Sequence, residues 1–237
     1  MWLVAEYEPI TLFSFRSGMA TSSGAKTLFL PTPFAIRTAL LDAAIRTNGL
    51  AAGPAAFERI KRLSIAVRPP ERVVVTNLFA KILKPTRQEE AEEAMGRTIA
   101  FREYAQLEGV VALAFGVDEE FREQLKQLLP QVNYFGKRGS FFQLRDVPRE
   151  SDGLPVGFCA LDGMSLPCQG DMRGHPETFP LGIVQAMDDW GETLTYDKVN
   201  VYSSEKIVLG KDRIRKSVVL PYRLVRASKG FSYYERL

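Results

Sequence analysis

The segment from Thr98 to Leu144 constrains the fold most, because its hydrophobic pattern changes from strand-like to helix-like within a short distance. Thr98–Leu107 and the apolar run Val110–Val117 predict two strands, joined by a turn at Glu108-Gly109. Asp118 is a good residue to cap the start of a helix, and the two glutamates after it suit the positive end of a helix dipole. The segment therefore predicts strands paired with a helix that covers them.

A helix and a basic loop complete this segment. The apolar side chains of the helix fall on one face, and Pro130 ends it; these side chains are Phe121, Leu125, Leu128 and Leu129. The loop that follows has a run of aromatic, glycine and basic residues that ends in a serine: Tyr134, Phe135, Gly136, Lys137, Arg138, Gly139 and Ser140. Glycines let a backbone pass close to a ligand, and the two cations between them add positive charge. This loop, residues 134–140, is a candidate binding loop, and we call it the glycine loop.

The first third of the chain predicts a strand, a polar loop and a helix. Trp2–Tyr7 is rich in strand-forming residues. The loop Arg16–Lys26 is rich in glycine and serine, and such a loop is either disordered or a binding segment. Thr32 predicts the helix start with Pro33 at its first position, and Gly49 predicts the helix end. The spacing of apolar residues places Arg37 and Arg46 off the buried face of this helix.

The middle of the chain predicts a short helix and two further strands. Ala55–Lys61 forms the helix, and Leu63–Val67 the next strand. A strand that begins at Arg72 continues through Phe79–Lys84, and after a charged tip the chain returns along Thr98–Leu107. A ferredoxin-like fold has the order strand–helix–strand–strand–helix–strand, and several of the predicted strands compete for its four strand positions. The fold class expected is α+β, with a core over residues 1–145 and a protruding pair of strands around residues 79–107.

From Asp146 to residue 237 the chain is expected to form an irregular, β-rich extension. Glycine and proline punctuate residues 148–180 densely, which argues against long helices. Leu181–Met187 is a short apolar piece, and Trp190 can anchor it. Thr193–Tyr202 alternates like a strand, Glu205–Leu209 is a further possible strand, and residues 213–225 read as extended segments with basic flanks.

Composition excludes several classes of protein. The 237 residues are 46% hydrophobic and 25% charged, as in ordinary globular proteins. No apolar stretch is long enough to cross a membrane, and the first residues lack a secretory pattern. Two cysteines do not make a disulfide framework, so a reduced, cytoplasmic protein is expected. A net charge of +3 permits nucleic-acid binding only if basic residues cluster.

The sequence carries no pattern for a metal or nucleotide cofactor, and none is expected. Cys159, Cys168 and His175 lack the spacing of a zinc site. Asp188 and Asp189 are consecutive, so on a strand their side chains point apart and do not form a ready metal clamp. The glycines of the basic loop are not followed by the long helix of a phosphate-binding P-loop.

Three features together resemble the Cas5 family of CRISPR-associated proteins, in a segment that covers about residues 1–145. They are the strand with Arg102-Glu103-Tyr104, the amphipathic helix, and the loop YFGKRGSFF. The string PTPFAIRTALLDAA also resembles the family segment that leads into the first helix. The resemblance implies a RAMP-superfamily subunit of the Cascade surveillance complex that holds the 5′ handle of the CRISPR RNA in antiviral defence. It implies a ferredoxin-like core with a thumb.

The resemblance also implies RNA-contacting residues and partners. The first loop and helix supply Arg16, Lys26 and Arg37, and the glycine loop supplies Tyr134 and Gly136–Ser140. The thumb supplies Lys81, Lys84, Arg87 and Arg102. The expected partners are the CRISPR RNA, the adjacent Cascade backbone subunit and the large subunit, with target DNA contacted indirectly.

Two other functions stay open at this point. Some members of the family are metal-independent endoribonucleases that process repeat RNA with tyrosine, lysine and histidine. Here Lys137 lies in the glycine loop, but the sole histidine is elsewhere, so a non-catalytic cap on the guide is favoured. The third possibility is an unrelated α+β domain.

Overall fold

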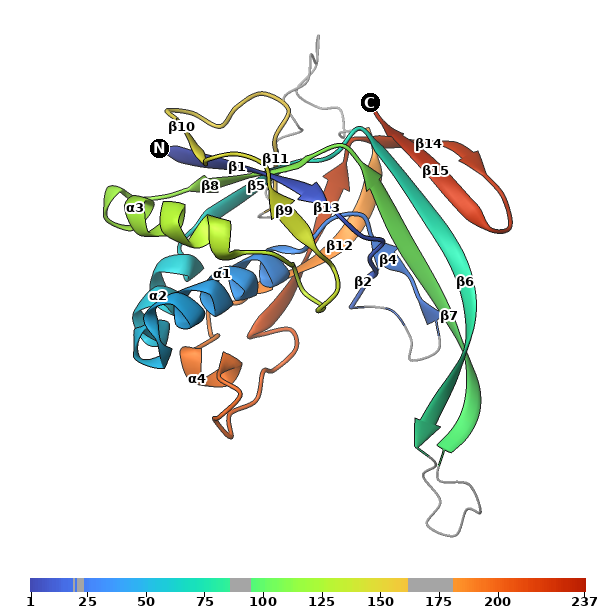
Figure 1. Ribbon diagram of the computed structural model, residues 1–237, viewed down its shortest axis with the longest axis horizontal. Coiled ribbons are helices and arrows are strands. Elements are labelled where there is room, and N and C mark those ends of the chain that lie inside the picture. The colour runs from blue at the N-terminus through green and yellow to red at the C-terminus, as the bar shows by residue number, and fades with distance from the viewer. Residues whose placement is uncertain (19, 21–23, 86–94, 162–180) are drawn as a thin grey trace.

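The protein has a mixed α/β fold built, within the described residues, from four α-helices and several sheets whose strands pair antiparallel, except for β3 with β7 (Figure 1). The computed structural model describes residues 1–18, 20, 24–85, 95–161 and 181–237. Arg87, Cys168 and His175 therefore lie outside the described residues. The elements are β1 (Trp2–Pro9), β2 (Phe15–Arg16), β3 (Gly24–Ala25), β4 (Thr27–Leu28), α1 (Pro33–Asn48), α2 (Gly53–Lys61), β5 (Ser64–Arg68), β6 (Arg72–Pro85), β7 (Met95–Glu108), β8 (Val111–Gly116), α3 (Glu119–Leu128), β9 (Phe142–Leu144), β10 (Arg149–Ser151), β11 (Cys159–Ala160), β12 (Ile183–Trp190), α4 (Tyr196–Val199), β13 (Arg213–Leu220), β14 (Tyr222–Ala227) and β15 (Phe231–Arg236).

Local signals in the sequence set the helix ends as predicted. The Thr32 hydroxyl accepts a hydrogen bond from the backbone N–H of Ala35 at the start of α1. Gly49 ends that helix with a φ of 81°, a conformation that glycine adopts without strain. The Asp118 carboxylate caps α3 by accepting from the N–H of Phe121 at 2.8 Å. The buried face predicted for α3 is also confirmed, because Phe121, Leu125 and Leu128 are all buried.

The first sheet has the strand order β10-β1-β8-β5-β11, and β9 also pairs with β1. All of these neighbours are antiparallel. The helices α1, α2 and α3 lie together on one side of this sheet in Figure 1. Tyr7 of β1 is fully buried, and its hydroxyl donates a hydrogen bond to the carbonyl of Leu129 at 2.8 Å. Burial raises the pKa of the Tyr7 phenol well above its ordinary range, so the hydroxyl stays a donor.

The second sheet has the order β14-β15-β6-β7-β3. Its centre is the long pair of β6 and β7, which stays in register from Arg72 opposite Glu108 to Pro85 opposite Met95. The far end of this pair extends away from the rest of the molecule (Figure 1). The last strand of the chain, β15, pairs with β6, so residues from the last part of the chain complete the sheet.

Residues after position 145 contribute to both sheets. β10 and β11 join the first sheet, and β14 and β15 join the second. β12 and β13 form a separate antiparallel pair that packs against α1. Cys159 in β11 is disulfide-bonded, against the expectation of reduced cysteines, and its partner lies outside the described residues. Within the described ranges, every helix is too short or too polar to span a bilayer.

The strand predicted for Thr193–Tyr202 is wrong, and so is the one predicted for Glu205–Leu209. Turns and the one-turn helix α4 occupy the first segment, and no strand is assigned to the second. The buried carboxylate of Asp212 explains the difference, because it binds three groups from these segments: the Thr193 hydroxyl at 2.7 Å, the Lys198 ammonium at 2.9 Å and the Val208 N–H at 2.8 Å. Side-chain bonds to a carboxylate compete here with strand pairing.

These bonds make the stability of the loop dependent on pH. They hold the pKa of Asp212 at about 2, below its usual value of 3.8. A carboxylate with a lowered pKa stabilises the fold fully above its usual pKa, and that contribution is lost as the pH falls through the lowered value. Asp212→Asn should therefore lower the free energy of unfolding at pH 7, and the deficit should vanish as the pH falls from about 4 to about 2.

Urea unfolding at a series of pH values measures this deficit. Asp197→Asn is the matched control, because Asp197 lies in α4 of the same loop and is exposed. A deficit for Asp212→Asn that persists unchanged at pH 2 would show that the charge of the carboxylate does not stabilise the loop.

Candidate functional site

Two adjoining hollows beside α1 gather cationic side chains from distant parts of the chain. One has a volume of about 620 Å³ and is lined by Arg16, Asp188, Arg213 and Arg215, among others. The other has a volume of about 330 Å³ and is lined by Arg16, Lys137, Asp188 and Arg213, with residues from the first turn of α1. Because they share three side chains, we treat them together and call them the arginine hollow. Volumes of this size suit small ligands or single nucleotides.

The glycine loop forms one wall of the arginine hollow and is held from below. Phe135 is buried, with its ring 5.3 Å from that of Tyr7 and 5.1 Å from that of Phe142. Tyr134 forms an isolated bridge with Phe141, which closes the loop. The buried ring of Phe135 fixes the base of the glycine loop, whereas the tip of the loop is exposed.

The tip of the glycine loop presents backbone and charge to solvent. Gly136 and Gly139 have φ values of 70° and 98°, which favour glycine at both turns. Lys137 and Arg138 between them are exposed and have no ion-pair partner among the described residues. The Thr11 hydroxyl donates to the carbonyl of Gly139 at 2.9 Å and so ties the tip to the end of β1. The tip is thus both fixed in position and free to bind an anion.

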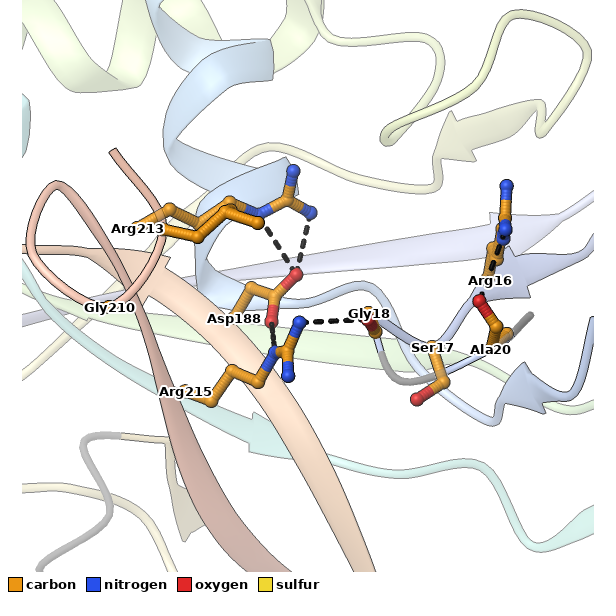
Figure 2. Close-up of a pocket in the computed structure, with 9 residues that line it drawn as sticks. Arg16, Ser17, Gly18, Ala20, Asp188, Gly210, Arg213 and Arg215 are labelled. Atoms are coloured by element: carbon orange, nitrogen blue, oxygen red, sulfur yellow. Dashed lines mark hydrogen bonds and ion pairs between the residues drawn. The ribbon is translucent and has the colours of Figure 1, made fainter. Parts of the chain in front are cut away.

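The opposite wall comes from β12 and β13. Figure 2 shows Asp188 between the guanidinium groups of Arg213 and Arg215, and Gly18 beside Arg215. Arg213 donates two hydrogen bonds to Oδ2 of Asp188, at 2.9 and 2.6 Å. Arg215 lies 3.5 Å from Oδ1 of the same carboxylate. Neither arginine nor Asp188 is among the binding residues predicted from the sequence, although the basic flanks of this strand were visible there.

The structure brings only some of the predicted binding residues together. Arg16, Gly136 and Lys137 line the arginine hollow. The other predicted loop positions do not line it: Lys26, Arg138 and Gly139 are exposed, Tyr134 is partly buried and Ser140 is buried. On the extended pair of strands, Lys81 is exposed on β6, Arg102 is partly buried on β7, and Lys84 lies on β6. Arg87 is outside the described residues.

The predicted position of Arg37 is wrong. The side chain is buried and does not face solvent, with an ion pair of 2.9 Å to Asp189. Its remaining donors bind backbone carbonyls at the end of α2 and beyond it, those of Ile60 at 2.6 Å and Leu63 at 2.9 Å. A guanidinium in this position satisfies carbonyls that a helix end leaves unpaired. Arg37 therefore joins α1, α2 and β12 and has no exposed donor face for a ligand.

The two consecutive aspartates of β12 bind different arginines. Asp189 pairs with Arg37, and Asp188 with Arg213, as expected for side chains that point apart on a strand. Among residues 1–18, 20, 24–85, 95–161 and 181–237, no group of three histidine, cysteine, aspartate or glutamate side chains is arranged to hold a metal ion. The chemistry available in the arginine hollow is the binding of anions by guanidinium, ammonium and backbone N–H groups.

Comparison with known proteins points to CRISPR-associated proteins. Over 110 residues the chain is similar to the CRISPR-associated protein Cas5 of Archaeoglobus fulgidus, with 32% identity. The match covers 46% of this chain and 48% of that protein, so it spans about half the length of each. No protein-family model matches the sequence.

A comparison with solved structures also found CRISPR proteins, with TM-scores below 0.5. One is the crystal structure of a CRISPR protein from Archaeoglobus fulgidus, with 14% identity and a TM-score of 0.44, covering 100% of this chain and 92% of that one. Another is a chain of a CRISPR RNA-guided surveillance complex, with 17% identity and a TM-score of 0.45, covering 92% and 90% of the two chains.

Proposed function

We propose that this Cas5 homologue is a non-catalytic subunit of a CRISPR surveillance complex that binds the 5′ handle of the CRISPR RNA. The main observation behind the proposal is that Arg16 and Lys137 line the same part of the arginine hollow, together with the exposed backbone of Gly136. Cations that converge with close backbone approach suit a phosphate chain. The homology to Cas5 makes a guide RNA the appropriate phosphate chain.

The strand order supports a RAMP-type core in this proposal. Strands β9, β1, β8 and β5 are neighbours in that order, and α1 and α3 follow β1 and β8 along the chain. This order supports a ferredoxin-like sheet, in which two helices cover one face. In such a core the glycine loop after α3 and the segment before α1 come to the same end of the sheet. The extended pair of β6 and β7 would then be the thumb.

Exposed apolar side chains on this pair of strands support a protein partner for the thumb. Phe79 is 71% exposed and Ile99 63% exposed, and both lie on the part of β6 and β7 that extends from the body. Contiguous apolar surface of this kind is uncommon on a protein without partners. We assign it to the adjacent backbone subunit of the complex, and we keep Lys81 and Lys84 of β6 as proposed contacts to the guide. Contacts to the large subunit, and indirectly to target DNA, belong to the same proposal, as does a place in the cytoplasm.

The chemistry of the hollow supports a role in binding rather than cleavage. Metal-independent RNA cleavage needs a general base to take a proton from the 2′-hydroxyl. The carboxylate that lines the arginine hollow, Asp188, is buried and paired with two arginines, so it is poorly placed to accept that proton. Repeat RNA incubated with the protein without metal should therefore stay intact.

Charge removal at the tip of the glycine loop tests the binding function. Lys137→Ala combined with Arg138→Ala should weaken binding to single-stranded RNA that contains the handle, because two phosphate-binding cations are removed. Each phosphate that the protein no longer neutralises should lower the slope of log affinity against log salt by about 0.7. The fold should be unaffected, since exposed loop charges contribute little to stability. Fluorescence anisotropy with labelled RNA at several salt concentrations measures both quantities.

A matched control removes two exposed arginines elsewhere. Arg59 and Arg62, at the end of α2, line neither part of the arginine hollow, so Arg59→Ala with Arg62→Ala should leave the salt slope unchanged. The proposal is contradicted if both double variants bind handle RNA alike, or if wild-type protein cuts the repeat RNA.

A further inference from the structure

Arg213 and Arg215 form a fixed pair of guanidinium groups on one face of β13. They are two residues apart, so their side chains leave the same side of the strand. Asp188 of β12 is the register partner of Arg215 and the diagonal neighbour of Arg213. One carboxylate from the facing strand thus contacts both guanidinium groups.

Arg213 is held in place from two sides. Its Nε and Nη2 atoms both bind Oδ2 of Asp188, and its guanidinium lies over the ring of Phe34 at 4.4 Å from the centroid. Stacking on an aromatic ring and pairing with a carboxylate both restrict the rotamers of an arginine. The side chain is nevertheless 37% exposed, and its Nη1 atom has no hydrogen-bond partner among the described residues.

Arg215 is held by Asp188 and by the backbone of the first loop. Its Nη2 atom donates to the carbonyl of Gly18 at 2.8 Å. A side chain at Gly18 would be crowded, because a Cβ atom there would lie 3.0 Å from Nε of Arg215 and 3.2 Å from Oδ1 of Asp188. The loop that contains Gly18 therefore packs directly against Arg215 and Asp188. Arg215 is still 44% exposed, and its Nη1 atom is also without a hydrogen-bond partner in the described ranges.

The cluster of Arg213, Asp188 and Arg215 has an excess of positive charge. Asp188 is 5% exposed in its side chain, so solvent has little access to the carboxylate, whereas both arginines reach the hollow. One carboxylate balances one guanidinium and leaves a net charge of +1. Arg16 lies across the same hollow and adds to this charge. An anion that enters would meet donors already oriented by the protein, so less side-chain entropy would be lost on binding.

We propose that this cluster binds a phosphate of single-stranded RNA, with Arg213 and Arg215 as contacts and Asp188 as the residue that positions them. The inference rests on the proposed RNA-binding function but assigns a second contact, on other residues. The RNA would pass from Lys137 on the glycine loop, across Arg16 and Arg213, to Arg215. The two parts of the arginine hollow are continuous through Arg16 and Arg213, which gives the chain this path.

Arg215→Gln is the first test, because Asp188 keeps both hydrogen bonds from Arg213 in this variant and the fold should survive. We expect affinity for single-stranded RNA to fall about tenfold, as for removal of a charge-assisted hydrogen bond. The salt slope should fall by about 0.7 for one phosphate. Fluorescence anisotropy is measured with two labelled RNAs, the handle-containing repeat fragment and polyuridine of equal length.

A second variant tests the oriented guanidinium rather than the charge alone. Arg213→Lys keeps a positive charge near Asp188 but loses the planar fork and its paired hydrogen bonds. RNA affinity should fall while the salt slope stays close to that of the wild type. The matched control is Arg223→Gln on β14, which also removes a strand arginine paired with a carboxylate, that of Glu235, but lies outside the hollow. This control should bind as the wild type does.

The outcomes separate this inference from the proposed function. If Arg215→Gln and Arg213→Lys both bind RNA like the wild type while the glycine-loop variant binds weakly, the β13 contact is wrong and the handle function stands. If the wild type shows no preference for the handle over polyuridine, the handle function fails. A lowered salt slope of Arg215→Gln on polyuridine would then still support the β13 contact, and an unchanged slope would overturn it. Thermal unfolding confirms that each variant is folded.

Discussion

Arg37→Met should destabilise the protein by about 3–5 kcal/mol, the range found when one partner of a buried ion pair is removed. The variant would leave the buried Asp189 carboxylate with the Trp190 N–H at 2.7 Å and, as its only cation among the described residues, the more distant Lys216 at 3.6 Å. It would also remove donors from the carbonyls of Ile60 and Leu63. Urea unfolding followed by circular dichroism gives the difference in free energy of unfolding.

Arg46→Met is the matched control on the same helix. Arg46 pairs with Asp42 one turn earlier, and both side chains are well exposed, so this substitution should cost about 0.5 kcal/mol or less. Replacing Asp189 together with Arg37 by apolar residues should recover part of the stability, because no unpaired charge is then buried. Equal stability of Arg37→Met and Arg46→Met would contradict the structural role assigned to Arg37.

The contrast between Arg37 and the helix caps shows what the sequence could predict. Thr32 and Asp118 cap their helices through partners three residues away, so a local pattern contains the whole interaction. Arg37 is buried by Asp189, which lies 152 positions along the chain. The helical spacing of its neighbours cannot reveal such a partner, and an arginine without a known partner is reasonably placed on the surface.

The same limit explains the errors in the last part of the chain. The alternation of residues 193–202 is typical of a strand, but Asp212 draws this segment into turns through side-chain bonds. Residues 231–236 form the strand β15, which is not predicted from the sequence, and it pairs with β6 from a distant part of the sequence. Pairing across such a separation depends on the complete fold, whereas the strand propensity of the aromatic tail is local.

The sequence predicts only one wall of the arginine hollow, the glycine loop, and not the wall formed by β12 and β13. The glycines and cations of residues 136–139 form a local motif, and the resemblance to Cas5 suggested that the segment around Arg16 lies near it. In the sequence, Asp188 stands out only as the neighbour of Asp189, a pair that does not form a ready metal clamp. Its role as the counter-ion of Arg213 and Arg215 depends on the register of β12 and β13, which no spacing within either strand encodes.

Phe135→Ala should destabilise the protein by about 3–5 kcal/mol, the cost of replacing a buried phenylalanine by alanine. Phe135 is 1% exposed and packs edge-on against Tyr7 and Phe142, so its removal leaves a cavity between rings that are held by β1 and β9. Because the glycine loop continues directly from this residue, its tip should also lose its fixed position. Guanidinium chloride unfolding measures the stability, and anisotropy measures RNA affinity.

Phe141→Ala is the matched control for Phe135→Ala. Phe141 closes the same loop but is 47% exposed, so its removal should change stability by about 0.5 kcal/mol or less. If Phe135 fixes the loop, Phe135→Ala at temperatures where it remains folded should bind RNA more weakly than the wild type although no charge has changed. An affinity equal to that of the wild type would mean that Lys137 and Arg138 bind RNA without a fixed loop, and equal stability of the two variants would contradict the packing of Phe135.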